Sequence, residues 1–158
     1  MIRQIARLSK TVPALSDQAI AIAVYADAKG DYVTAREAGF EGVACVDDAA
    51  RAFNLFDAIW RSTGLRWSQQ WCTGLLDFIL AMQREDGQWF NFIKDWDGTI
   101  NRETRTSVAG GHFWQARAMF ALAHARTSFD DARLEDAIRR GSAILLDVPT
   151  PSDVRALH

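Results

Sequence analysis

The chain has few residues of the kinds that bind metals or form disulfides. Its 158 residues include two cysteines and three histidines. Cys45 and Cys72 lie in apolar sequence and lack CxxC spacing, so we expect both thiols to be reduced and buried. The histidines, His112, His124 and His158, are not spaced as metal ligands. We therefore expect no metal and no other cofactor.

The chain also lacks an excess of positive charge and a long apolar run. Eighteen basic and 20 acidic side chains give a formal net charge of -2, with no basic stripe to neutralise phosphates. We expect no nucleic-acid partner, and no membrane segment, because no apolar run approaches the roughly 20 residues that span a bilayer. Arg3, Arg7 and Lys10 resemble the start of a signal peptide, but polar residues interrupt the apolar segment that should follow. These features predict a cytoplasmic protein.

Apolar residues instead recur with helical spacing through most of the chain. Hydrophobic residues make up 49% and charged residues 24%, which fits one globular domain of the all-α class. Asp47 or Asp48 is expected to cap the first helix, Gly64 to end it, and Asp86-Gly87 to end the second. The expected helices span about 47–61, 68–84, 112–127 and 132–146.

Two regions depart from this helical period. Residues 19–28 are apolar without a clean period and fit either a short helix or an extended segment. Between Gln88 and Thr106 the apolar residues alternate, and Asp97-Gly98 is a strong tight-turn pair, which predicts a small β-hairpin inserted between two helical pairs.

The expected organisation is a single partial domain over residues 1–158. Two helical hairpins and the first turn of a third are too few to close a ring of helices, so we expect either a fragment of a larger protein or self-association, and favour the fragment. The parts are an irregular N-terminal segment at 1–46, a first hairpin at 47–86, the β-hairpin insertion at 87–108, a second hairpin at 109–148 and the start of a third at 152–158.

One phrase occurs three times, each time where a helical stretch begins. Asp48-Ala49-Ala50-Arg51-Ala52-Phe53 returns as Trp114-Gln115-Ala116-Arg117-Ala118-Met119, and begins again as Asp153-Val154-Arg155-Ala156-Leu157. Repeated helix starts are typical of stacked helical hairpins, in which equivalent residues face a common surface. The three arginines either bind an anionic substrate or tie neighbouring helices to carboxylates, and their repetition favours ties.

Three stretches together resemble the α/α toroid, or six-hairpin glycosidase-like, superfamily, and within it a carbohydrate-associated group. The resemblance implies an incomplete (α/α) toroid of helical hairpins, with inner helices around a funnel and substrate chemistry on the loops at one end. The stretches are Gly39 to Ala52, Met82 to Phe92 and Thr106 to Ala118.

Carboxylates at the expected funnel mouth are the candidate catalytic groups. Glycoside hydrolysis needs an acid and a base about 6.5 to 9.5 Å apart when it inverts stereochemistry, so two adjacent residues do not suffice. We expect the general acid to be Asp47 or Asp48, unless both only cap the helix and bind Arg51. The candidates for the partner are Asp95, Asp97 and Glu103.

Aromatic residues gather in the same part of the sequence. Sugar rings pack on aromatic faces while amides and carboxylates bind their hydroxyls, although such rings also form hydrophobic core. His112 begins a helix and is either the base of a sugar epimerase or a structural histidine. The expected substrate-binding residues are Arg51, Trp89, Phe92, Trp96, His112, Trp114 and Arg117.

The leading functional hypothesis is a glycosidase-like domain that acts on carbohydrate as part of a larger enzyme. A second hypothesis is a non-catalytic carbohydrate-binding or scaffolding helical domain, in which the aromatic residues bind sugar and no acid/base pair forms. A third is a sugar isomerase or epimerase that uses His112.

Overall fold

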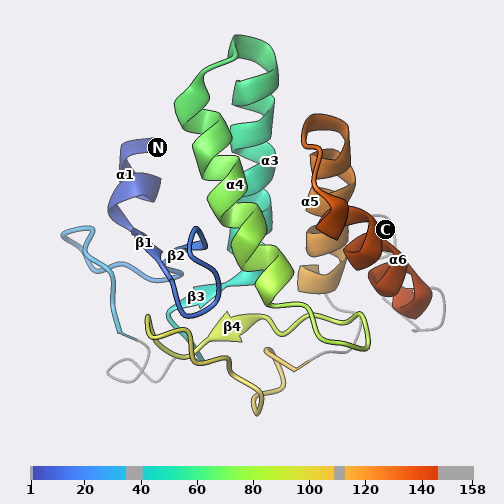
Figure 1. The fold of residues 1–158 in the computed structure, drawn as a ribbon. Helices are drawn as coiled ribbons and strands as arrows, with labels where there is room; N and C mark the ends of the chain where they lie inside the picture. Colours follow the sequence, from blue (N-terminus) through green and yellow to red (C-terminus); the bar gives the residue numbers. More distant parts are fainter. Residues whose placement is uncertain (1, 35–40, 109–112, 146–158) are drawn as a thin grey trace.

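The fold is mostly helical. The computed structural model describes residues 2–34, 41–108 and 113–145 (Figure 1). A short helix, α1 (Ile2–Arg7), precedes two strands, and two helical hairpins follow. Within the described residues the elements are β1 (Ser9–Thr11), β2 (Ile20–Ile22), β3 (Ala44–Cys45), α3 (Val46–Thr63), α4 (Arg66–Ala81), β4 (Phe92–Ile93), α5 (Phe113–Ser128) and α6 (Ala132–Leu145).

The four expected helices are confirmed, with corrections at two of their ends. Gly64 ends α3 in the left-handed conformation, as the sequence predicts. The expected cap is wrong, because Cys45 is the N-cap of α3, and Asp47 and Asp48 lie inside its first turn. The expected end of the second helix is also wrong: α4 ends at Ala81, and Asp86-Gly87 belongs to a separate turn in which the Arg84 N–H donates to the Gln88 carbonyl at 2.7 Å.

The strands are short and pair across long stretches of sequence. β1 pairs with β2, which settles the 19–28 segment as extended around Ile20–Ile22, and β3 pairs with β4. Both pairs are antiparallel. The expected hairpin is only partly correct: its turn exists, with a bridge between Ile93 and Ile100, but β4 takes β3 as its main partner. Sequence periodicity alone does not reveal β3 as the partner, because the paired residues lie 47 and 49 positions apart in the chain. The register pairs Ala44 with Ile93 and Cys45 with Phe92.

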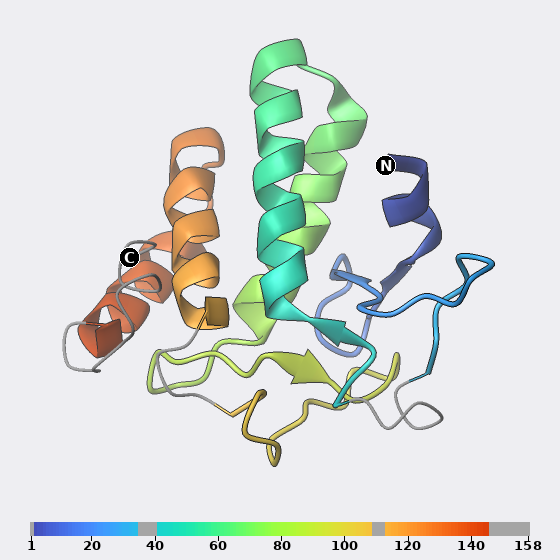
Figure 2. The ribbon, with the colours of Figure 1, turned by 180° about the vertical axis from the view of Figure 1, so that it is seen from behind.

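The helices α3 and α5 pack side by side and run in the same direction. Figures 1 and 2 show both rising from the end of the molecule where the strands lie, with α4 and α6 returning beside them. This arrangement brings the first turns of α3 and α5 together, as the repeated phrase predicts for its first two copies. The third copy, with Arg155, lies outside the described residues.

A continuous apolar core holds the hairpins on the strands. Phe53 and Phe56 of α3 are fully buried, as are Leu75 and Phe78 of α4. Trp89 is also fully buried, and its indole N–H donates to the Ile79 carbonyl at 2.8 Å.

Among the helices within the described residues, none is long and apolar enough to cross a membrane.

Two glycines with positive φ give a test of this packing. Gly87 has φ +90°, and a Cβ there would lie 2.2 Å from the Arg140 carbonyl oxygen, whereas Gly64 has φ +67° with open space around it. We expect Gly64→Ala to lower the free energy of unfolding by about 1 kcal/mol, the cost of a left-handed backbone. Gly87→Ala should cost at least about twice as much, because α6 must also shift. Urea denaturation of both variants measures the difference, and equal losses would contradict the packing of α6 on this turn.

Candidate functional site

A cavity of about 530 Å³ lies at the N-terminal ends of α3 and α5. The helices supply four of its charged residues and two aromatic rings, and the segments before α3 and around β4 supply the rest, including Glu41. Its lining residues are Val24, Tyr25, Glu41, Cys45, Asp47, Asp48, Arg51, Asn91, Phe92, Thr106, Phe113, Trp114 and Arg117. The cavity therefore combines three carboxylates, two guanidinium groups and four aromatic rings.

Asn91 closes the N-terminal end of α3 in place of an aspartate cap. The Val46 N–H donates to the Asn91 carbonyl at 2.8 Å, and the Asp47 N–H donates to its side-chain oxygen at 3.3 Å. The Asn91 amide in turn donates to the Thr106 carbonyl at 3.2 Å. Because Asn91 binds these first N–H groups, the side chains of Asp47 and Asp48 point to other partners.

Asp47 joins the two parallel helices. The Nη1 atom of Arg117, on α5, donates to both carboxylate oxygens of Asp47, on α3. Both side chains are largely buried, with 25% of Arg117 and 20% of Asp47 exposed. Arg51 approaches the same carboxylate, with Nε 3.7 Å from Asp47 Oδ2. Arginines from two copies of the repeated phrase thus converge on one carboxylate.

Asp48 is the more accessible of the two adjacent carboxylates. Its Oδ1 lies 3.8 Å from Arg51 Nη1, and 34% of its side chain is exposed. The Cys45 thiol lies 3.5 Å from its other oxygen and donates to it. Asp48 therefore reaches the cavity with one loose ion pair and one weak thiol hydrogen bond.

Burial and the nearby carboxylates keep the Cys45 thiol protonated. Desolvation, and then the charge of Asp48, raise the pKa of Cys45 well above its usual value. Since the thiolate is the nucleophilic form, Cys45 acts here as a hydrogen-bond donor. Burial also raises the pKa of Cys72, on α4, to about 12.

Aromatic side chains form the apolar part of the cavity. Phe113 is 45% exposed, and Tyr25 is 36% exposed. Phe92 and Trp114 are mostly buried, and the Trp114 indole N–H donates to the Trp89 carbonyl at 2.9 Å. Phe113 and Tyr25 are therefore the rings that offer the most open surface to a ligand.

The structure brings together six of the residues that the sequence predicts for the site. These are Asp47, Asp48, Arg51, Phe92, Trp114 and Arg117, all of which line the cavity. His112 lies outside the described residues, and its expected role stays a prediction.

The other expected site residues lie elsewhere. Trp89 has no exposed surface and belongs to the core, so it has no face for a ligand. Trp96 packs edge-on against Tyr32, with ring centroids 5.5 Å apart. The three carboxylates expected as catalytic partners, Asp95, Asp97 and Glu103, do not line the cavity.

Local contacts explain the positions of these three carboxylates. Asp95 and Asp97 accept backbone N–H groups of the tight turn, from Trp96 at 2.7 Å and Thr99 at 2.8 Å. Glu103 pairs with Lys94 at 2.9 Å on the surface.

The residues expected for the site omit five polar or aromatic residues of the cavity. Tyr25, Glu41, Asn91, Thr106 and Phe113 all line it, although most of them lie far apart in the chain. Glu41 has a sequence signal, because it lies between two glycines just before the helix that carries Asp47. Tyr25 and Thr106 have none, since only the pairing of distant strands brings their segments to the start of α3.

Comparisons with models of known protein families and with curated proteins find no match to this chain. Within the described residues, no three His, Cys, Asp or Glu side chains gather as a metal site requires.

The ion pair between Arg117 and Asp47 should contribute measurably to stability. We expect Arg117→Gln to lower the free energy of unfolding by about 2 kcal/mol, because it leaves a largely buried carboxylate with one distant guanidinium group. The matched control is Arg139→Gln, since Arg139 forms an ion pair with Asp136 in which both side chains are more than half exposed. Its effect should stay below about 0.5 kcal/mol. Equal effects in chemical denaturation would show that the pair does not tie α3 to α5.

Thiol reactivity tests the surroundings of the two cysteines. At pH 8 we expect negligible reaction of the native protein with Ellman's reagent and full reaction after denaturation, because both thiols are buried and protonated. The stabilising contribution linked to the raised pKa of Cys72 is fully present below the unfolded value of 9.0 and is lost as the pH rises toward about 12. Rapid reaction of one native thiol would contradict the observed burial.

Proposed function

We propose that the cavity binds a carbohydrate and that the chain is a glycosidase-like, carbohydrate-active domain. The observation that carries this proposal is the meeting of open aromatic faces with hydroxyl-binding groups in one cavity. Phe113 and Tyr25 offer faces to the C–H side of a sugar ring. Asp48 and Thr106 offer oxygen atoms for its hydroxyls.

The charges of the cavity favour a neutral sugar over an acidic one. Its lining has three carboxylates, those of Glu41, Asp47 and Asp48, and two guanidinium groups. The formal charges of these five groups sum to -1, which disfavours an added negative charge. This balance argues against an anionic substrate for Arg51 and Arg117, and favours their role in holding carboxylates in place.

Hydrolysis of a glycosidic bond is the reaction that fits these carboxylates best. Asp47 is held by Arg51 and Arg117. Asp48 is therefore the accessible carboxylate of the two adjacent aspartates. Glu41 lines the same cavity and replaces Asp95, Asp97 and Glu103 as candidate partner. In this proposal Asp48 and Glu41 divide the acid and base roles between them.

The proposed architecture behind this site is an incomplete α/α toroid. Support comes from α3 and α5, which run in the same direction side by side (Figure 2). Equivalent arginines of the two helices meet at Asp47. Two repeated hairpins so arranged form an arc whose inner helices meet at the cavity.

A non-catalytic carbohydrate-binding domain is the second candidate. It is favoured by the engagement of Asp47 in an ion pair and by the absence of Asp95, Asp97 and Glu103 from the cavity lining. In that case the aromatic rings bind sugar and no bond is cleaved. The isomerase hypothesis rests on His112 and stays a prediction.

Sugar binding and cleavage are tested together on a panel of neutral oligosaccharides. We expect a ligand that raises the melting temperature, since binding to the native state adds stability. Phe113→Ala should lower the affinity for this ligand about tenfold, because one aromatic stacking contact is lost. Asp48→Asn should abolish release of reducing ends while binding persists. The measurements are calorimetric titration and a reducing-end assay.

Two control variants keep the test specific. Phe120→Ala removes a ring of α5 that is 43% exposed and does not line the cavity, and Asp130→Asn neutralises an exposed acid elsewhere. Both should bind sugar as the wild type does. Binding without turnover by the wild type supports the non-catalytic domain, and no saturable binding to any sugar contradicts both candidates.

A further inference from the structure

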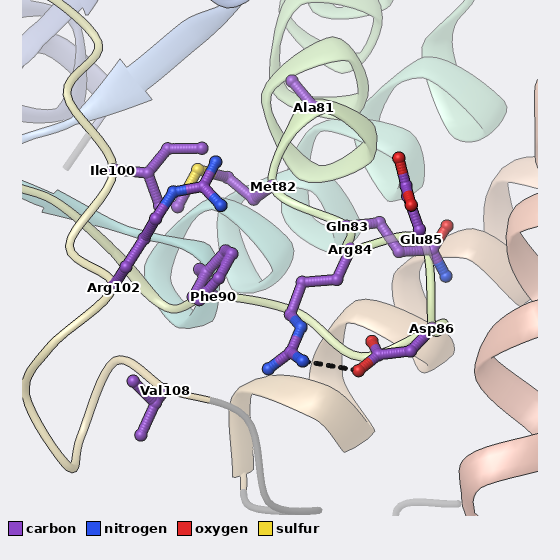
Figure 3. Close-up of a pocket in the computed structure, with 10 residues that line it drawn as sticks. All are labelled: Ala81, Met82, Gln83, Arg84, Glu85, Asp86, Phe90, Ile100, Arg102 and Val108. Atoms are coloured by element: carbon purple, nitrogen blue, oxygen red, sulfur yellow. Dashed lines mark hydrogen bonds and ion pairs between the residues drawn. The ribbon is translucent and has the colours of Figure 1, made fainter.

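A second cavity of about 680 Å³ opens on the turn after α4 and the loop after β4 (Figure 3). It shares no lining residue with the first cavity. Its wall is apolar where Met82, Phe90, Ile100 and Val108 meet, and Met82 and Phe90 are buried. The carbohydrate proposal makes no use of these residues.

Two arginines from different segments hold their charges against one aromatic ring. The guanidinium carbon of Arg84 lies 5.2 Å from the centroid of the Phe90 ring, and that of Arg102 lies 4.9 Å from it. Figure 3 shows Phe90 between the two arginine side chains. Cation–π contacts at these distances stabilise both guanidinium groups in positions beside the apolar wall of the cavity.

Arg102 has its charge available for a ligand. Its side chain is exposed, and among the described residues no carboxylate lies within ion-pair distance of it. Its guanidinium group presents a planar set of N–H donors that matches the oxygens of a carboxylate or phosphate.

Arg84 is held more loosely than its short ion pair suggests. It binds Asp86 at 2.6 Å, but 35% of Arg84 and 41% of Asp86 are exposed. Ion pairs in such contact with water contribute little net energy, so a ligand oxyanion can share this guanidinium group. The other lining carboxylate, Glu85, points away from the Phe90 ring (Figure 3).

We propose that this second cavity binds a small organic oxyanion, with a phosphate or carboxylate group on an apolar body. Arg102 and Arg84 bind the oxygens, and Phe90 with Ile100 packs on the body of the ligand. The ligand needs both an oxyanion and an apolar body, since the two guanidinium groups lie directly against the apolar wall.

Phenyl phosphate, benzoate and inorganic phosphate are the probes for this site. We expect saturable binding of phenyl phosphate, about tenfold tighter than inorganic phosphate because its ring adds apolar burial. Arg102→Gln should lower the affinity for phenyl phosphate about tenfold, because a charge-assisted hydrogen bond is lost. Calorimetric titration measures the affinities, and benzoate shows whether a carboxylate substitutes for the phosphate. Shifts of the Ile100 and Val108 methyl resonances locate the ligand.

The matched control is Arg105→Gln, which removes an exposed arginine of the same loop that does not line the cavity. It should leave the affinity unchanged. Asp48→Asn should also leave it unchanged, which separates this site from the carbohydrate cavity. The proposal is overturned if the wild type shows no saturable binding of phenyl phosphate, or if Arg102→Gln and Arg105→Gln weaken it equally.

Discussion

The ion pair between Arg117 and Asp47 sets the geometry at the end of the molecule that holds the first cavity. It joins the first turns of α3 and α5, two helices that begin 67 residues apart in the chain. Because both groups are largely buried, separating the helices would leave Arg117 without its carboxylate and Asp47 with only the more distant Arg51. The pair therefore favours one relative position of the helices, and the cavity between their N-terminal ends follows from that position.

The loop around β4 completes this end of the molecule. Asn91 binds the first N–H groups of α3, and the Phe92 N–H is bound by the Ser107 hydroxyl at 3.0 Å. Since Asn91 takes the capping role, Asp47 is released to bind Arg117 and Asp48 is released to face the cavity. One buried amide thus leaves Asp47 to hold the two helices together and Asp48 to face a ligand.

Sequence periodicity predicted the four long helices, since each buries a stripe of apolar residues such as Phe53 and Phe56. The repeated phrase also predicted that Arg51 and Arg117 would face one surface, and both lie at Asp47. The capping role of Asn91 was not predictable, because it depends on a strand pairing between residues far apart. The same pairing placed Glu41 in the cavity and left Asp95 and Asp97 in their own turn. Residue type alone did not predict the position of Trp89. This tryptophan lies among polar residues in the sequence, yet it is fully buried in the core.

The proposed carbohydrate site is the cavity between Asp48 and Phe113. The most direct measurement is a backbone and side-chain NMR titration of the whole chain with neutral oligosaccharides. The account predicts saturable shifts centred on Tyr25, Asn91, Thr106 and Phe113, with none at Ile100 or Val108 in the second cavity. Saturable shifts confined to any other surface, or no shifts at the cavity residues with any sugar, would contradict it.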